Sequence, residues 1–149
     1  MKKLLIYYSH TGNGDYVSSF FKEKGYDIRK VTEKKKMPKS FFIQIMVGGF
    51  RAGIGAKGKL INYSSDVDMY DEIVIASPIW NGKFPPATNA ILSKTNLSNK
   101  KVSFVLYSGS GAGVGATKKI NKLFKNAPII YLKEPKKYPE EIKKLEPLF

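Results

Sequence analysis

Four short apolar runs, at residues 4–8, 72–76, 102–107 and 127–132, alternate along the chain with segments of mixed polarity. A fifth segment, residues 26–31, is more polar and has Ile28 as its inward residue. Continuous apolar runs of this length are typical of strands covered on both faces, which favours a parallel sheet. The run at 72–76 is expected to be the central strand.

The segments between these runs carry the spacing of helices. Phe20 and Phe21 continue an apolar pattern that begins after residue 15, and Gly25 follows it as a helix-ending glycine would. Further helices are predicted at residues 41–46, 86–96, 120–124 and 141–145, the first of them running into a glycine-rich loop. Strands that alternate with helices specify an α/β fold, in which right-handed crossovers cover both faces of a parallel sheet.

Length and composition indicate one globular domain, residues 1–149, that has no redox-active thiol of its own. The chain is 42% hydrophobic and 26% charged, and it contains no cysteine. The missing cysteines exclude disulfides, thiolate zinc sites and iron–sulfur ligation, so any redox chemistry must come from a bound cofactor. The apolar run after Lys3 is too short for a signal peptide and no run is long enough to span a membrane, so a cytoplasmic location is expected.

The formal net charge of +14 is the most unusual bulk property. A field of this sign attracts anionic partners, so a redox partner or small molecule with an acidic surface or anionic groups is expected. Only Arg29 and Arg51 are arginines, although base readout and bidentate phosphate contacts favour arginine. We therefore interpret the scattered lysines as a solvated surface, with no specific nucleic-acid site.

Polar, glycine-rich loops follow the first, third and fourth predicted strands. Ligands of open parallel sheets bind at the carboxyl ends of the strands, where the winding direction switches. The first loop reads Ser9-His10-Thr11-Gly12-Asn13-Gly14, and its hydroxyls, glycines and helix start suit a phosphate dianion. It lacks the Gly-Lys-Ser/Thr ending of a nucleoside-triphosphate loop, and the alternative for it is an ordinary strand-to-helix connection rich in capping residues. Asp15 is expected to face outward, because its charge would repel a phosphate.

The second and third loops could complete a binding site. The second contains Trp80, the only tryptophan, which could fill a gap in the packing of the fold or stack on a planar ring. Asn81-Gly82 follows, a pair that can adopt backbone conformations closed to other residues. The third loop allows close backbone approach or could act as a hinge. It reads Ser108-Gly109-Ser110-Gly111-Ala112-Gly113. No complete dinucleotide fingerprint accompanies the first strand and helix, which argues against a nicotinamide-binding Rossmann domain.

These three loops, in this order over nearly the whole chain, resemble those of flavodoxins and related flavodoxin-like FMN oxidoreductases. The resemblance implies a five-stranded parallel sheet of order 2-1-3-4-5, with FMN as the cofactor. Residues 9–14 would hold the phosphate, and Trp80 would lie near the isoalloxazine face, with the Asn81–Gly82 peptide near N5. The remaining implied contacts are Pro78 and Ile79 along the ring, and Tyr107, Ser108, Gly109, Ser110 and Gly111 on its pyrimidine side.

Two features depart from the flavodoxin pattern. Gly14 stands where the flavodoxin phosphate loop usually has a hydroxyl residue. Flavodoxins that shuttle electrons are typically acidic, whereas this chain is basic.

His10 is the only histidine, so a catalytic triad or a metal site is not expected, and the flavin would carry the chemistry. We favour an electron carrier, monomeric or homodimeric, over an NAD(P)H-dependent FMN, quinone or nitro reductase. A third alternative is a polyanion-binding module without a flavin.

Overall fold

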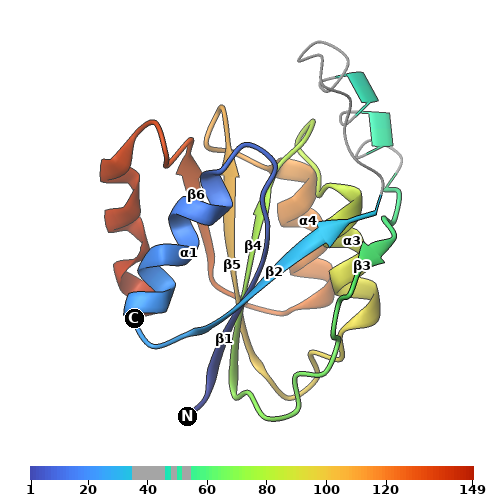
Figure 1. The fold of residues 1–149 in the computed structure, drawn as a ribbon. Helices are drawn as coiled ribbons and strands as arrows, with labels where there is room; N and C mark the ends of the chain where they lie inside the picture. Colours follow the sequence, from blue (N-terminus) through green and yellow to red (C-terminus); the bar gives the residue numbers. More distant parts are fainter. Residues whose placement is uncertain (35–45, 48–49, 52–54) are drawn as a thin grey trace.

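The computed structural model describes residues 1–34, 46–47, 50–51 and 55–149. Its centre is a six-stranded sheet of order β3-β2-β1-β4-β5-β6, in which β1 pairs with β2 on one side and β4 on the other (Figure 1). All strands except β3 are parallel to their neighbours. The bounds of the strands are β1 Lys3–Tyr8, β2 Asp27–Glu33, β3 Leu60–Ile61, β4 Glu72–Pro78, β5 Lys101–Ser108 and β6 Ile129–Lys133.

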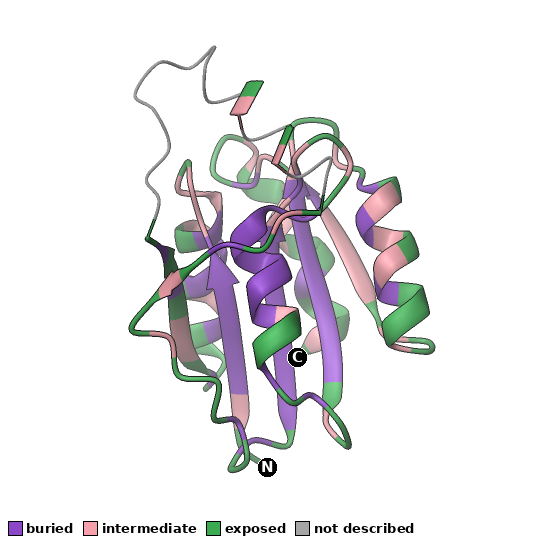
Figure 2. Ribbon diagram, turned by 90° about the vertical axis from the view of Figure 1, so that its right-hand side faces the viewer, coloured by how far each residue is buried: buried purple, intermediate pink, exposed green. Residues whose placement is uncertain are grey.

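Helices cover both faces of the sheet. The helix α1 (Asn13–Glu23) and the 3-10 helix η1 (Pro139–Leu148) lie on one face, and α3 (Pro86–Lys94) and α4 (Val114–Leu123) on the other (Figure 1). Alternate strand residues point to opposite faces, so β1 contributes Leu5 to the core under α1 and Leu4 to the core under α3. Figure 2 shows the consequence: the central strands are buried along most of their length.

The α/β class and the mostly parallel sheet are confirmed, whereas the expectation of a five-stranded sheet is wrong. The sixth strand, β3, pairs antiparallel with the end of β2 over two residues, which is too short a segment to produce a periodic pattern. The helix expected at 41–46 falls almost entirely outside the described residues, and the terminal helix is wound as a 3-10 helix. No described helix combines the length and apolarity needed to cross a bilayer.

A buried carboxylate stabilises the amino-terminal end of the sheet. Glu72 accepts a hydrogen bond from the Tyr26 hydroxyl and lies 2.9 Å from Lys101 Nζ. Burial raises the pKa of Glu72, but the hydrogen bonds from Tyr26 and Lys101 outweigh it and bring this pKa below its ordinary value of 4.5. The ionised carboxylate therefore stabilises the fold above that pH, and its contribution is lost as the pH falls further.

We expect Glu72→Gln to lower the free energy of unfolding by about 1 kcal/mol at neutral pH, since it weakens two charge-assisted hydrogen bonds. The difference from wild type should shrink as the pH falls below 4.5, the ordinary pKa of the carboxyl. Urea denaturation at several pH values measures both effects. Glu140→Gln removes the same charge from an exposed position and should leave the pH profile unchanged. A difference that stays constant down to acidic pH would contradict the role of the Glu72 charge.

Candidate functional site

Three connecting segments meet at the carboxyl edge of the sheet. Because β1, β4 and β5 are parallel neighbours, the β1–α1 turn (residues 9–14), the β4–α3 loop (residues 79–85) and the β5–α4 loop (residues 109–113) emerge together at its upper edge in Figure 1. The site residues expected from the sequence lie on these segments or on the strand ends beside them. The fold thus gathers at one edge three segments that other strands and helices separate in the sequence.

The β1–α1 turn presents hydrogen-bond donors at the start of a helix. Gly12 adopts φ +93°, α1 begins at Asn13, and the Gly14 N–H donates to Ser9 Oγ at 3.1 Å. The N–H groups of Gly12 and Asn13 have no hydrogen-bond partner within the described part of the chain. Free N–H groups and the positive end of the helix dipole together favour an anion.

The packing around Gly14 explains why no hydroxyl residue stands there. A Cβ atom at this position would lie 2.4 Å from Tyr107 Oη, 2.8 Å from Ser9 Cβ and 2.9 Å from a ring carbon of Tyr7. Tyr107 is buried beneath the turn, where its hydroxyl donates to the Tyr8 carbonyl and where burial raises its pKa well above the ordinary range. The side chain of Tyr107 therefore supports the turn from below and does not line the open edge.

Asp15 faces outward, as expected. Its carboxylate accepts a hydrogen bond from the Tyr7 hydroxyl at 2.8 Å and pairs with Lys30 at 2.7 Å. Burial raises the pKa of Asp15, but the hydrogen bonds from Lys30, Tyr7 and Ser9 and the charge of Lys30 outweigh it and lower this pKa, so the group is ionised at neutral pH. The negative charge is therefore held by its own partners at the side of α1.

The β4–α3 loop fixes Trp80 beside the β1–α1 turn. Residues Trp80 and Lys83 exchange backbone hydrogen bonds of 2.9 and 3.0 Å around Asn81 (φ +51°) and Gly82 (φ +73°), the signature of a type I′ turn. The indole makes edge-on contacts with the rings of Tyr8 and His10, each at a centroid distance of 6.0 Å. Trp80 is thus oriented by the two residues that flank Ser9.

The β5–α4 loop closes against the β4–α3 loop. Ala116 N–H, in the first turn of α4, donates to the Gly82 carbonyl at 2.9 Å, and Gly113 and Gly115 leave room for Ile79 and Lys83. The Ser108 hydroxyl exchanges hydrogen bonds of 3.1 Å with the backbone of Ala112. This network argues against a hinge, while residues 109–111 remain largely open to solvent at the edge.

A buried ion pair borders the site on the side of β2 and was not anticipated from the sequence. The Glu33 side chain is 3% exposed, pairs with Arg51, and leaves Oε2 without a hydrogen-bond partner in the described residues. Burial and, next, the charge of Glu33 raise the pKa of Tyr8 to about 12, so Tyr8 stays protonated. The two residues are 18 positions apart in the sequence and belong to no recognisable motif, so the sequence gives no sign that they pair.

The comparison with solved structures identifies the fold. A presumed flavoprotein of Bacteroides eggerthii DSM 20697 is 16% identical, with a TM-score of 0.74 over 97% of this chain and 96% of that one. A flavoprotein of Lactobacillus acidophilus NCFM in complex with FMN is 17% identical, with a TM-score of 0.67 over 93% of this chain and 97% of that one. The chain has the flavodoxin-like fold. Oxidised Flavodoxin 2 of Bacillus cereus is 16% identical, with a TM-score of 0.50 over 99% and 94% of the two chains.

At sequence level the comparisons add nothing, because no protein-family model and no curated protein matches the chain. The site of this flavodoxin-like chain therefore has to be judged from its own residues. Among the described residues, no three histidine, aspartate or glutamate side chains gather in a way that could hold a metal ion. This edge of the sheet provides hydrogen-bond donors that could bind an anion and an aromatic ring that could contact a planar group.

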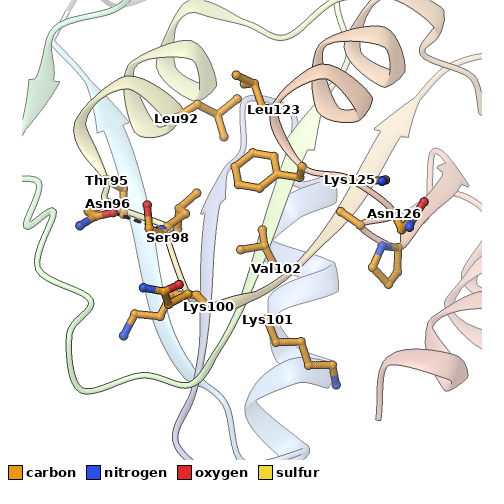
Figure 3. Close-up of a pocket in the computed structure, with 15 residues that line it drawn as sticks. Leu92, Thr95, Asn96, Ser98, Lys100, Lys101, Val102, Leu123, Lys125 and Asn126 are labelled. Atoms are coloured by element: carbon orange, nitrogen blue, oxygen red, sulfur yellow. Dashed lines mark hydrogen bonds between the residues drawn. The ribbon is translucent and has the colours of Figure 1, made fainter.

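A hollow of about 610 Å³ lies at the opposite edge, between the carboxyl ends of α3 and α4 (Figure 3). Lysines line it, but Lys100 donates to the carbonyls of Asp68 and Tyr70 at 2.9 and 2.8 Å, and Lys101 pairs with Glu72. Lys100 thus holds the loop before β4, and Lys101 holds the first residue of β4. The loops at the carboxyl edge are therefore the better candidate for function.

Proposed function

We propose that the whole chain, residues 1–149, forms one domain that binds FMN at the carboxyl edge of its sheet and transfers electrons through it. The observation that carries the proposal is the meeting of anion-binding donors at the start of α1 with a ring, Trp80, held beside them. FMN has the same two parts, a phosphate and a planar ring system. The FMN complex of the flavoprotein with the same fold supports this choice.

The donors of the β1–α1 turn fit the phosphate of FMN. The Ser9 and Thr11 hydroxyls and the N–H groups of Gly12 and Asn13 supply neutral donors, and the Asp15 carboxylate is held by Lys30 and Tyr7. His10, held edge-on to Trp80, would flank the phosphate, and Gly14 would let the turn pack on Tyr107 and so keep its N–H groups in place.

The other two loops fit the ring. Trp80 would stack on the isoalloxazine, the Asn81–Gly82 peptide would lie near N5, and Pro78 and Ile79 would border the ring. Ser108, Gly109, Ser110 and Gly111 would contact its pyrimidine side. Bound FMN supplies reversible uptake of electrons, while these residues bind it, orient it and limit the access of water to its ring.

We propose an electron carrier whose partner has an acidic surface or anionic groups. The formal net charge of +14 supports a partner of this sign, because the attraction accelerates encounter with an anionic molecule and repels a basic one. The same charge would also attract the phosphates of NADPH, so a reductase of this fold remains the second candidate. Steady-state oxidation of NADPH with a quinone separates the two, since a carrier without a reductase partner sustains no turnover.

Titration of the purified protein with FMN tests the central proposal. Trp80 is the only tryptophan, so quenching of its fluorescence reports directly on a flavin bound beside it. We expect quenching and a perturbed flavin spectrum at micromolar FMN. If neither change occurs, the chain does not bind FMN at this edge. Salt-sensitive binding of nucleic acid by a protein without flavin would favour the polyanion-binding alternative.

A further inference from the structure

A fourth segment, the β6–η1 loop (residues 134–138), is fastened to the β1–α1 turn. The Lys136 N–H donates to Asn13 Oδ1 at 3.1 Å, and the Glu134 N–H donates to the Ser108 carbonyl at 3.1 Å. The loop is held further by Lys137 N–H and Tyr138 N–H, which donate to the Glu134 carbonyl at 2.8 and 2.9 Å. It therefore bridges the turn after β1 and the end of β5.

This attachment lays the side chain of Lys136 across Gly12. Its Nζ lies 3.2 Å, and its Cδ 3.5 Å, from the position that a Cβ atom on Gly12 would take. The two other lysines nearby turn elsewhere: the Nζ atoms of Lys133 and Lys137 lie 5.3 and 5.2 Å from the ring centroid of Tyr138. Of these three lysines, Lys136 alone places its ammonium on the β1–α1 turn.

Lys136 is exposed, and the position of its ammonium beside a helix start favours an anion. The amino-terminal end of α1 carries partial positive charge, and a cation placed beside it is repelled. No aspartate or glutamate of the described chain forms an ion pair with Lys136, and the carboxylate nearest in sequence to this turn, Asp15, pairs with Lys30. A phosphate dianion between the helix end and the ammonium would convert this repulsion into two attractive interactions.

We propose that Lys136 binds the phosphate of the flavin and makes the site selective for phosphorylated flavin over riboflavin. The proposal rests on the FMN site proposed above and adds to it a charged residue from a loop outside the three sequence motifs. Neutral donors can hold a phosphate, but an ammonium adds an interaction that riboflavin, without a phosphate, cannot make. Selectivity between the two ligands is therefore the property that Lys136 controls.

The test compares Lys136→Gln with Lys137→Gln, which removes the same charge from the next residue without touching Gly12. Binding of FMN and of riboflavin is followed by quenching of Trp80 fluorescence at low and high ionic strength. We expect Lys136→Gln to raise the Kd for FMN by about fivefold to tenfold, the scale of one partly exposed charge-assisted hydrogen bond, with riboflavin affinity unchanged. Lys137→Gln should change neither affinity by more than about twofold.

Lys136→Arg provides a rescue, because it restores the charge and should recover most of the FMN affinity. The salt dependence of FMN binding should also be weaker in Lys136→Gln than in wild type. Equal effects of Lys136→Gln and Lys137→Gln, or equal losses for FMN and riboflavin, would overturn the inference and leave the FMN site standing. If wild type binds no FMN, the proposed function fails and the inference fails with it.

Discussion

Gly14→Ser is expected to destabilise the protein by about 3 kcal/mol and to weaken FMN binding, although flavodoxins usually have a hydroxyl residue at this place. A Cβ atom there would come within 2.4 to 2.9 Å of Tyr107, Ser9 and Tyr7. Two of these neighbours are buried aromatic residues, so the turn itself must shift. The shift would move the N–H groups that we propose for the phosphate. Chemical denaturation and FMN titration measure the two effects.

Gly109→Ser is the matched control for this substitution. Gly109 lies at the same edge of the sheet, and a Cβ atom there would meet nothing within 4 Å. We expect Gly109→Ser to change the free energy of unfolding by less than about 0.5 kcal/mol. If Gly14→Ser is as stable as wild type and binds FMN more tightly, the backbone of the turn can shift at little cost in free energy. In that case the packing of Tyr107 does not determine which residue stands at position 14.

Trp80→Ala is expected to weaken FMN binding by about 2 kcal/mol, which is roughly thirtyfold in Kd. The substitution removes the ring that would stack on the isoalloxazine, together with its edge contacts to Tyr8 and His10. Because the variant has no tryptophan, binding is followed by flavin absorbance. Trp80→Phe keeps an aromatic face and should lose only part of the affinity.

The stability of the same variant separates the two interpretations of Trp80. If Trp80→Ala lowers the free energy of unfolding but leaves the Kd for FMN unchanged, the tryptophan plugs the fold and does not stack on the flavin. A loss of FMN affinity with little change in stability supports the stacking role. Trp80 is only partly buried, so most of the fold should survive its removal.

The hydrophobic pattern was sufficient to predict the α/β class and most of the elements. A strand covered on both faces needs an unbroken apolar run, as at 72–76, and such runs can be recognised without knowing their neighbours. The two-residue β3 could not be predicted, because its pairing with Thr32 and Glu33 depends on where the intervening chain returns. FMN contacts at residues 9–14, 78–82 and 108–111 remain predictions of the sequence, whereas the side chain of Tyr107, also predicted to approach the ring, is buried beneath the β1–α1 turn.

The sequence by itself determined that turns suited to a ligand follow the first, third and fourth predicted strands, since glycines and hydroxyl residues are local features. Only the tertiary structure decided which residues from distant parts of the chain pack against those turns. Tyr107 lies under Gly14, and Lys136 lies across Gly12 although the two residues are 124 positions apart. Such contacts have no signal in a single sequence, because they depend on the order of the strands and on the packing of side chains between them.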